Sequence, residues 1–234
     1  MNPGLFEAFY NSPLQHPILL WVSNFIGTSL ALLALRKRSG EGASRLRRFV
    51  LTWALISALD AWLSANHVYG IGTLSAPWSS VVPFLFVWAG DFRIFLAMDL
   101  FSAGFPDRPV TLKVWRPVLA CFGVPIVAGL LTRGQDARIL FLVYEALFLV
   151  VITLYGRLTG TANHPSARRV RNLSWTWYAL WVAADILILT LSDGWRDLGF
   201  GLRVLPNLIY YGWFGWGVSR LLKAPHTPRS SECR

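Results

Sequence analysis

Six ionisable side chains interrupt stretches of sequence that are otherwise strongly apolar. They are one arginine and five carboxylic acids: Asp60, Asp91, Arg93, Asp99, Glu145 and Asp185. A charged residue at the centre of a bilayer costs about 2.5–3.5 kcal/mol on insertion scales, so such residues usually face the bundle interior and carry function. Because a carboxyl group in apolar surroundings can hold and transfer a proton, the first chemistry to expect is acid–base chemistry.

Aromatic residues share a helical face with three of these acids. The three stripes are Trp53, Ser57, Asp60, Ser64 and His67; then Phe84, Trp88, Asp91, Phe95 and Met98; and then Ser174, Tyr178, Trp181, Asp185 and Ser192. Further rings expected near the middle of the bilayer include Trp62, Tyr210 and Tyr211. Ring faces stabilise a desolvated cation by about 2 kcal/mol or more. The pattern therefore predicts one chamber for a lipophilic ligand that becomes cationic, with four of the carboxyl groups in it.

Seven apolar stretches must position these side chains. The chain of 234 residues is 54% hydrophobic and only 15% charged, against about 25% charged in a soluble domain. The stretches, each long enough to cross about 30 Å of hydrocarbon, are 16–35, 49–68, 80–103, 115–132, 138–158, 172–192 and 204–222. We predict an all-α integral membrane protein, a single seven-helix domain over 1–223, with a disordered cytoplasmic tail over 224–234.

The 22 basic residues are sorted by loop. Seventeen lie in the loops after the first, third and fifth stretches and in the tail, four lie in the loops on the other side, and Arg93 lies within a stretch. Under the positive-inside rule, this places the N-terminus outside and the C-terminus in the cytoplasm. The net charge of +10 is then expected to meet anionic lipid headgroups rather than nucleic acid. The expected location is a cell membrane: the inner membrane of a bacterium or the endoplasmic reticulum of a eukaryote.

Few residues in this chain are suited to hold a metal or a disulfide. The two cysteines, Cys121 and Cys233, are far apart, and none of the four histidines lies one helical turn from another. Zinc, haem and disulfides are therefore not expected. The first fifteen residues carry Glu7 and no basic segment, so the first apolar stretch is expected to direct insertion without a cleaved signal peptide.

Three short motifs lie in the first hundred residues. They are the W-x-x-N-F-x-G pattern of Trp21, Asn24, Phe25 and Gly27, the acid Asp60, and the run Trp88-Ala-Gly-Asp91. This set resembles the small seven-span integral-membrane terpene cyclases best known from fungal meroterpenoid and indole-diterpene pathways. That family has a further acid in its last span, whereas the last apolar stretch here, 205–223, has no carboxylate.

The resemblance implies a metal-independent and cofactor-independent cyclisation of a polyprenyl substrate. Asp60 stands where the family places its proton donor, and Asp91 and Asp185 are the candidates for supporting acid or final base. The candidate substrate-binding residues, on the resemblance and on the stripes together, are Trp88, Trp181, Tyr178, Trp62, Phe95, Asn24 and Tyr211. The substrate would be a lipophilic small molecule, and the oligomeric state is left open.

Other classes of function fit the same residues. A small carrier or proton-coupled transporter would use the intramembrane acids as a relay, a subunit of a membrane complex would use them only to join helices, and a hydrolase could use paired aspartates. An enzyme requires acids that face one closed aromatic pocket. A carrier requires a polar path with two ends, and a structural subunit requires acids that are satisfied by their neighbours.

Overall fold

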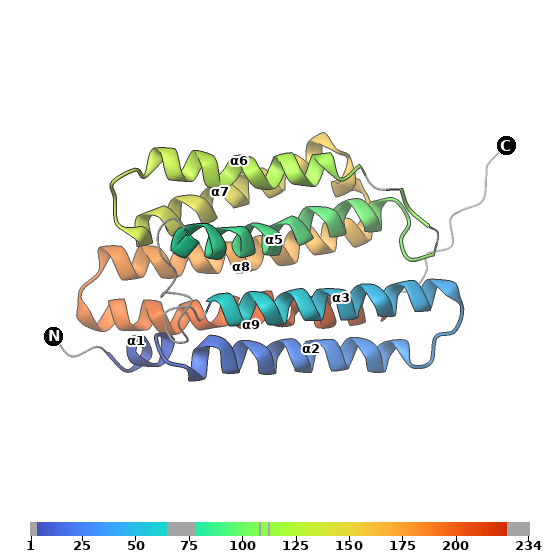
Figure 1. The fold of residues 1–234 in the computed structure, drawn as a ribbon, viewed down its shortest axis with the longest axis horizontal. Coiled ribbons are helices and arrows are strands. Elements are labelled where there is room, and N and C mark those ends of the chain that lie inside the picture. The colour runs from blue at the N-terminus through green and yellow to red at the C-terminus, as the bar shows by residue number, and fades with distance from the viewer. Residues whose placement is uncertain (1–3, 65–77, 108, 112, 224–234) are drawn as a thin grey trace.

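The protein forms a bundle of helices whose axes are roughly aligned with one another (Figure 1). The computed structural model describes residues 4–64, 78–107, 109–111 and 113–223, so the predicted tail 224–234 and His67 lie outside the described residues. The helices, in chain order, are α1 (Leu5–Tyr10), η1 (Leu14–Leu19), α2 (Leu20–Leu35), α3 (Glu41–Ser64), α5 (Trp78–Ser102), α6 (Trp115–Leu131), α7 (Ala137–Leu158), η3 (Thr161–Asn163), α8 (Pro165–Thr190) and α9 (Asp193–Lys223). Within the described ranges all regular structure is helical, which confirms the all-α prediction.

Three helical segments of the described chain are both long and apolar enough to cross a membrane. They are Leu14–Leu35, Arg138–Leu158 and Pro165–Thr190, with mean hydropathies of 2.0, 2.3 and 1.3, and α6 is apolar but shorter. By length and composition the structure thus supports three spans, fewer than the seven predicted. Each predicted stretch does overlap one long helix. Of the other helices, α3 begins in a basic segment, and α9 begins at Asp193, well before the predicted start at 204.

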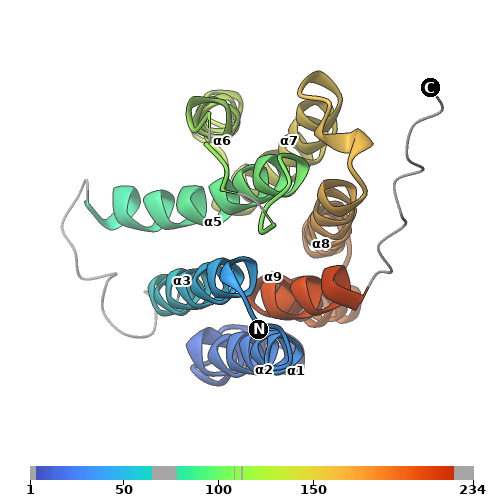
Figure 2. The same ribbon diagram turned by 90° about the vertical axis from the view of Figure 1, so that its right-hand side faces the viewer.

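Consecutive long helices are antiparallel, and α9 lies near the middle of the bundle. It packs along both α2 and α8, and α8 packs in turn against α7 and α5. Seen end-on, α2, α3 and α9 lie on one side, α6 and α7 on the other, and α5 and α8 between them (Figure 2). Helices far apart in sequence, such as α2 and α9, are therefore direct neighbours.

Small and polar side chains join α2 to α3 and α9. The indole N–H of Trp21 donates to the Ala58 carbonyl at 3.0 Å, and the Asn24 side-chain amide donates to the Ala54 carbonyl at 2.8 Å. These two bonds tie α2 to α3. Two positions of the first-span motif therefore serve helix packing, which agrees with the role of small and polar residues between helices in membranes.

The contact between α2 and α9 is a close approach of two backbones. The hydroxyl of Ser23 donates to the carbonyl of Leu208 at 2.7 Å. A methyl group added at Gly27 would meet the Cα and carbonyl carbon of Gly212 at 3.1 Å and would collide with the Gly212 carbonyl oxygen. Glycine at position 27 is thus required by the neighbouring helix.

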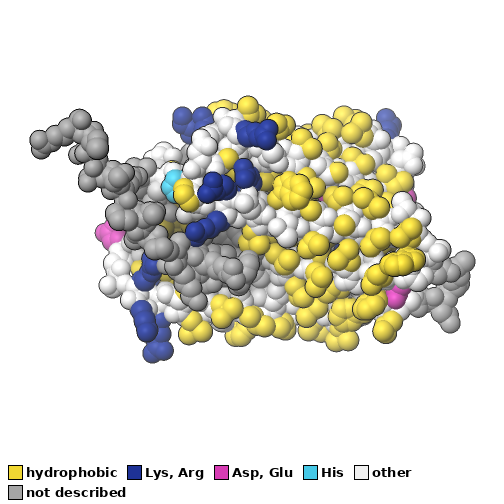
Figure 3. Space-filling view, turned by 180° about the vertical axis from the view of Figure 1, so that it is seen from behind, with side chains coloured by type: hydrophobic (Ala, Val, Ile, Leu, Met, Phe, Trp, Pro, Cys, Tyr) yellow, Lys and Arg dark blue, Asp and Glu magenta, His cyan; other side chains and the backbone are white. Residues whose placement is uncertain are grey.

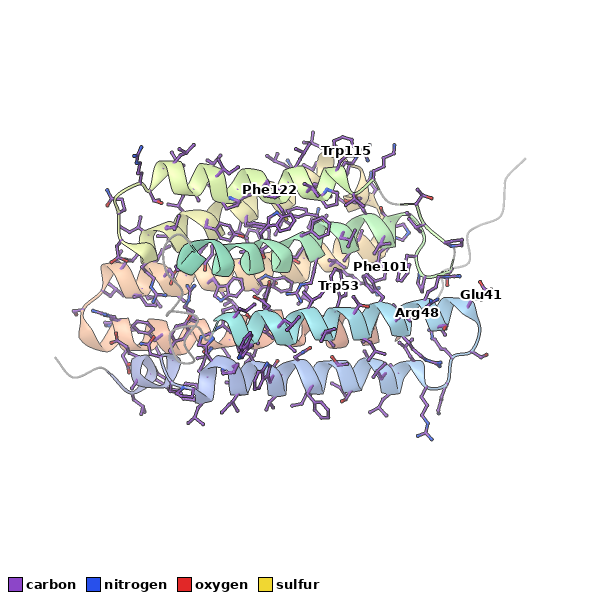
Figure 4. All side chains as sticks on the ribbon, viewed as in Figure 1. Glu41, Arg48, Trp53, Phe101, Trp115 and Phe122 are labelled. Carbon is purple, nitrogen blue, oxygen red and sulfur yellow. The ribbon has the colours of Figure 1, made fainter. Side chains whose placement is uncertain are left out.

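The two halves of the bundle differ in what fills them. Near the end where α3 begins and α5 ends, the core is apolar and aromatic, and Trp53 and Phe101 lie in the layer between those two helices (Figure 4). The Phe49 ring lies 5.2 Å from Trp53 and 6.3 Å from Phe101, centroid to centroid. Further along, Phe95, Met98 and Ile152 are completely buried. No carboxylate from the predicted chamber lies in this half.

The outer surface carries an apolar band and a basic end. Figure 3 shows hydrophobic side chains over much of the visible face. Most of the lysines and arginines on this face lie at one end, which is formed by the loops after α2, α5 and α7. On α2 alone, large apolar side chains are exposed at several positions, among them Phe25 at 73% and Leu33 at 63%. An apolar lateral surface with one basic end is what a bilayer and its anionic headgroups would favour.

Replacing Gly27 with alanine should loosen the contact between α2 and α9. We expect a loss of about 1–3 kcal/mol of stability, as for other overpacked sites, measured as a lower unfolding temperature in detergent. Gly123→Ala on α6 is the matched control, because an added methyl there has nothing within 4 Å. Equal stability of the two variants would contradict the close approach.

Candidate functional site

A cavity of about 120 Å³ lies in the half of the bundle away from the basic end. Three acids line it, Asp60 from α3, Asp91 from α5 and Glu145 from α7. Seven phenylalanine, tyrosine and tryptophan residues line it as well: Tyr10, Phe141, Tyr144, Tyr178, Trp181, Tyr210 and Tyr211. The structure thus brings three of the four chamber acids expected from the sequence to one aromatic-lined cavity.

Asp91 is held by two tyrosines from different helices. Its side chain is 2% exposed, and the hydroxyls of Tyr144 on α7 and Tyr178 on α8 each donate to one of its carboxylate oxygens. The Tyr178 ring stacks on Phe148 at 4.9 Å and meets the edge of Trp181 at 5.3 Å. Because packed rings fix both phenols, the orientation of the Asp91 carboxyl group in the cavity is fixed as well.

Asp60 is paired with Arg93, a residue of the same helix as Asp91. The Arg93 guanidinium is 3.7 Å from the Asp60 carboxylate, and the exposed fractions of the two side chains are 1% and 6%. Its Nε donates to the Gly90 carbonyl at 3.0 Å, and its Nη1 donates to the hydroxyl of Ser57. Asp60 and Ser57 lie one helical turn apart, so one face of α3 supplies both partners of the arginine.

Aromatic rings complete the surroundings of Arg93. Its guanidinium carbon lies 5.2 Å from the centre of the Tyr210 ring and 5.9 Å from that of Trp53. Gly90 leaves room for this arrangement, because a side chain there would collide with the Tyr210 hydroxyl. The arginine therefore lies between α3, α5 and α9, in contact with two residues that line the cavity, Asp60 and Tyr210.

A second charged cluster lies at the other end of the cavity. Arg203 on α9 donates to the Glu145 carboxylate at 3.0 Å and forms an ion pair with Asp185. Arg138 on α7 also reaches Asp185, at 3.3 Å. Tyr10 accepts a hydrogen bond from Arg203 Nε at 2.9 Å and lines the cavity as well. Two arginines and two carboxylates thus form a buried, charge-balanced network.

Three of the predicted binding residues line the cavity: Tyr178, Trp181 and Tyr211. Asp185, predicted as catalytic, does not line it; its side chain is fully buried behind the cavity, between Arg203 and Arg138. Asn24 lies between α2 and α3, bonded to the α3 backbone. Trp62 is 44% exposed on the outer surface.

The remaining two predicted binding residues, Phe95 and Trp88, do not line the cavity. Phe95 is completely buried in the apolar core, where its ring meets Phe148 at 5.7 Å and Tyr155 at 4.7 Å. Trp88 packs on Phe122 of α6 at 4.6 Å, on the side of α5 that faces α6. A residue three positions from Asp91 is rotated by about 60° on a helix, which is enough to place Trp88 against another neighbour.

Sequence reasoning missed Arg203 as a site residue. Arg203 is one of the four basic residues that the loop assignment places outside, whereas it lies inside α9 and is 7% exposed. A usable signal was present, because Arg203, Asn207 and Tyr210 recur at helical spacing and all three line the cavity. Tyr144, next to Glu145, gave no comparable signal, since its role depends on the position of Asp91 on another helix.

Comparison with protein-family models, with curated proteins and with solved structures gave no match. Among the described residues, no group of three or more His, Cys, Asp or Glu side chains is placed to hold a metal ion. The functional groups that the described cavity wall presents include carboxyl, phenol and guanidinium groups.

Replacing Arg93 with leucine should strongly destabilise the protein, because it leaves the buried Asp60 without its cation. Breaking such a pair costs about 3–5 kcal/mol, measured by unfolding in detergent. Adding Asp60→Asn to the same chain should restore part of that loss.

The control for this pair is Glu41→Gln at the basic end. Glu41 is 91% exposed where it pairs with Arg45, and exposed pairs contribute less than about 1 kcal/mol. An Arg93→Leu chain as stable as wild type would mean that Asp60 is satisfied without the arginine.

Proposed function

We propose that the protein is a membrane-embedded, acid-initiated cyclase or isomerase of a lipophilic, polyprenyl-type substrate. The observation that carries this proposal is the placement of Asp60 and Asp91 on one cavity whose walls are tyrosine and tryptophan rings. Two acids supply a proton donor and a proton acceptor, and the rings supply stabilisation for the cation that forms between them.

The different partners of the two acids separate their roles. A guanidinium stabilises a neighbouring carboxylate, so Asp60, paired with Arg93, is the better acceptor for the final proton. Asp91, whose oxygens contact tyrosyl hydroxyls, is then the donor. This assignment exchanges the roles that the family resemblance implies for Asp60 and its supporting acid.

The reaction balances without any external reactant. The Asp91 carboxyl gives its proton to an epoxide oxygen or a terminal alkene carbon, and the C–O bond or the π bond opens to leave a carbocation. The π electrons of the next alkene then form a C–C bond and move the positive charge along the chain. The last cation loses a proton to the Asp60 carboxylate, the two acids exchange the proton, and the product is an isomer of the substrate.

The closed inner end of the cavity favours an enzyme over a carrier. On the side of the basic end, the described bundle is filled by buried apolar residues such as Phe95, Met98 and Ile152. A carrier needs a polar path that reaches both surfaces, and this apolar layer opposes one. The volume of about 120 Å³ is comparable to an engineered cavity of about 150 Å³ that holds benzene, so a longer chain would extend beyond the described cavity.

We further propose that all seven long helices cross the membrane, with the N-terminus outside and the C-terminus in the cytoplasm. The exposed apolar side chains and the basic end (Figure 3) support this placement. The protein would then lie in a cell membrane, the inner membrane of a bacterium or the endoplasmic reticulum of a eukaryote. A lipophilic substrate would enter from the surrounding lipid.

Cysteine labelling in intact cells or vesicles should reveal this orientation. In a chain carrying Cys233→Ser, the variant Gln135→Cys should react with a membrane-impermeant maleimide from outside, whereas Ser39→Cys should react only after permeabilisation. Both positions are exposed in loops at opposite ends of the bundle. The reverse pattern, or equal labelling of both positions, would rule out the proposed topology.

Purified protein should convert a polyprenyl or epoxy-polyprenyl compound into an isomer of unchanged mass, detected by mass spectrometry. Asp91→Asn and Asp60→Asn should each lower the rate by about 10²–10⁴-fold, the usual contribution of a general acid or base. Asp99→Asn is the matched control, because Asp99 binds the Tyr155 hydroxyl at 2.7 Å and does not line the cavity. No conversion by a well-folded wild type would instead favour a carrier, to be tested by proton flux in liposomes.

A further inference from the structure

Glu145 has one carboxylate oxygen that the protein leaves without a partner. Its Oε1 accepts from Arg203 at 3.0 Å, whereas its Oε2 is buried and has no hydrogen-bond partner among the described residues. The side chain is 4% exposed and lines the cavity. A buried acceptor without a hydrogen bond costs free energy, so this oxygen is suited to accept a hydrogen bond from a molecule in the cavity.

The surroundings hold this carboxylate in place. Arg203 is fixed from the other side by the Tyr10 hydroxyl at 2.9 Å and by its ion pair with Asp185. Glu145 is also next in sequence to Tyr144, which is bound to Asp91. The carboxylate is thus a positioned acceptor, and it belongs to a different part of the cavity wall from the two proposed catalytic acids.

The charge of the cluster indicates the kind of ligand group that fits. Glu145 and Asp185 are balanced by Arg203 and Arg138 within hydrogen-bonding or ion-pair distance. An ammonium group would add an uncompensated charge to this balanced cluster, and a phosphate would meet the two carboxylates. A neutral donor, such as the hydroxyl of an alcohol, can donate a hydrogen bond to Glu145 Oε2 without changing the net charge of the cluster.

The spacing of residues along α9 gives the distance between the Glu145 end of the cavity and the end at Asp60 and Asp91. Arg203, at the Glu145 end, and Tyr210, which lies over Arg93 at the catalytic end, are seven residues apart on one face. At 1.5 Å per residue this separates the ends by about 10 Å. Asn207 lies between them, held by the Trp181 indole N–H at 2.8 Å.

We propose that Glu145 is a specificity-determining residue that binds a hydroxyl group of the substrate, roughly 10 Å from the reacting atoms. The inference rests on the proposed function, because it names the substrate class as a lipophilic alcohol. In the complex with substrate, the alcohol O–H donates a hydrogen bond to Glu145 Oε2, and the reacting end of the chain lies between Asp91 and Asp60.

The test measures binding, so it does not depend on turnover. The probes are hexahydrofarnesol, a saturated isoprenoid alcohol that cannot be cyclised by protonation of an alkene, and its methyl ether, which can accept but not donate a hydrogen bond. Calorimetry on wild-type protein in detergent should show about tenfold or more tighter binding of the alcohol, as for hydrogen bonds to a charged group. In Glu145→Gln the side-chain amide can donate to either probe, so the preference should fall to about threefold or less.

Two controls separate this site from the catalytic acids. Glu41→Gln, the same substitution at the exposed basic end, should retain the full preference, and Asp91→Asn should retain it while losing turnover. Equal binding of the two probes by wild type would overturn the inference without any variant, and so would a full preference in Glu145→Gln. A clear preference with no isomerisation of any substrate would instead refute the proposed reaction and leave the hydroxyl site standing.

Discussion

The requirement that every buried carboxylate find a partner shapes this protein. Five acids lie within apolar helices, and an uncompensated charge in such surroundings is costly. Four of them are buried, and each is met from another helix: Asp60 by Arg93, Asp91 by two tyrosines, Asp185 by Arg203 and Arg138, and Glu145 by Arg203. These contacts tie α3 to α5, α5 to α7 and α8, and α8 to α7 and α9. The polar network therefore fixes which helices are neighbours and how each is rotated.

The same requirement divides the bundle into two halves. Polar groups gather around the cavity, and the half near the basic end is filled by apolar and aromatic side chains. A packed apolar layer at one end excludes water from the acids, which strengthens their interactions with any ligand. Glu145 lines the cavity, with one oxygen paired with Arg203 and the other buried without a hydrogen-bond partner among the described residues.

The first-span motif illustrates how a likeness in sequence can report packing. Trp21, Asn24 and Gly27 lie on one side of α2, where they contact the backbones of α3 and α9. None of them lines the cavity. In a membrane, close helix contacts depend on small residues and on side-chain bonds to backbone carbonyls, so such residues can recur for reasons of assembly alone. The motif therefore supports the arrangement of the helices more directly than it supports an activity.

The sequence alone determined that the chain is helical, where its long helices lie, and that Asp60 and Asp91 belong to the interior, because hydropathy and helical spacing are local properties of the chain. It could not decide that Asp185 lies behind the cavity between two arginines while Glu145 lines the cavity, since both are single acids in similar apolar stretches. It also could not place Arg203 inside the bundle or turn Trp88 toward α6. Those outcomes depend on the rotation and neighbours of each helix, and only the packing of α5, α7, α8 and α9 sets them.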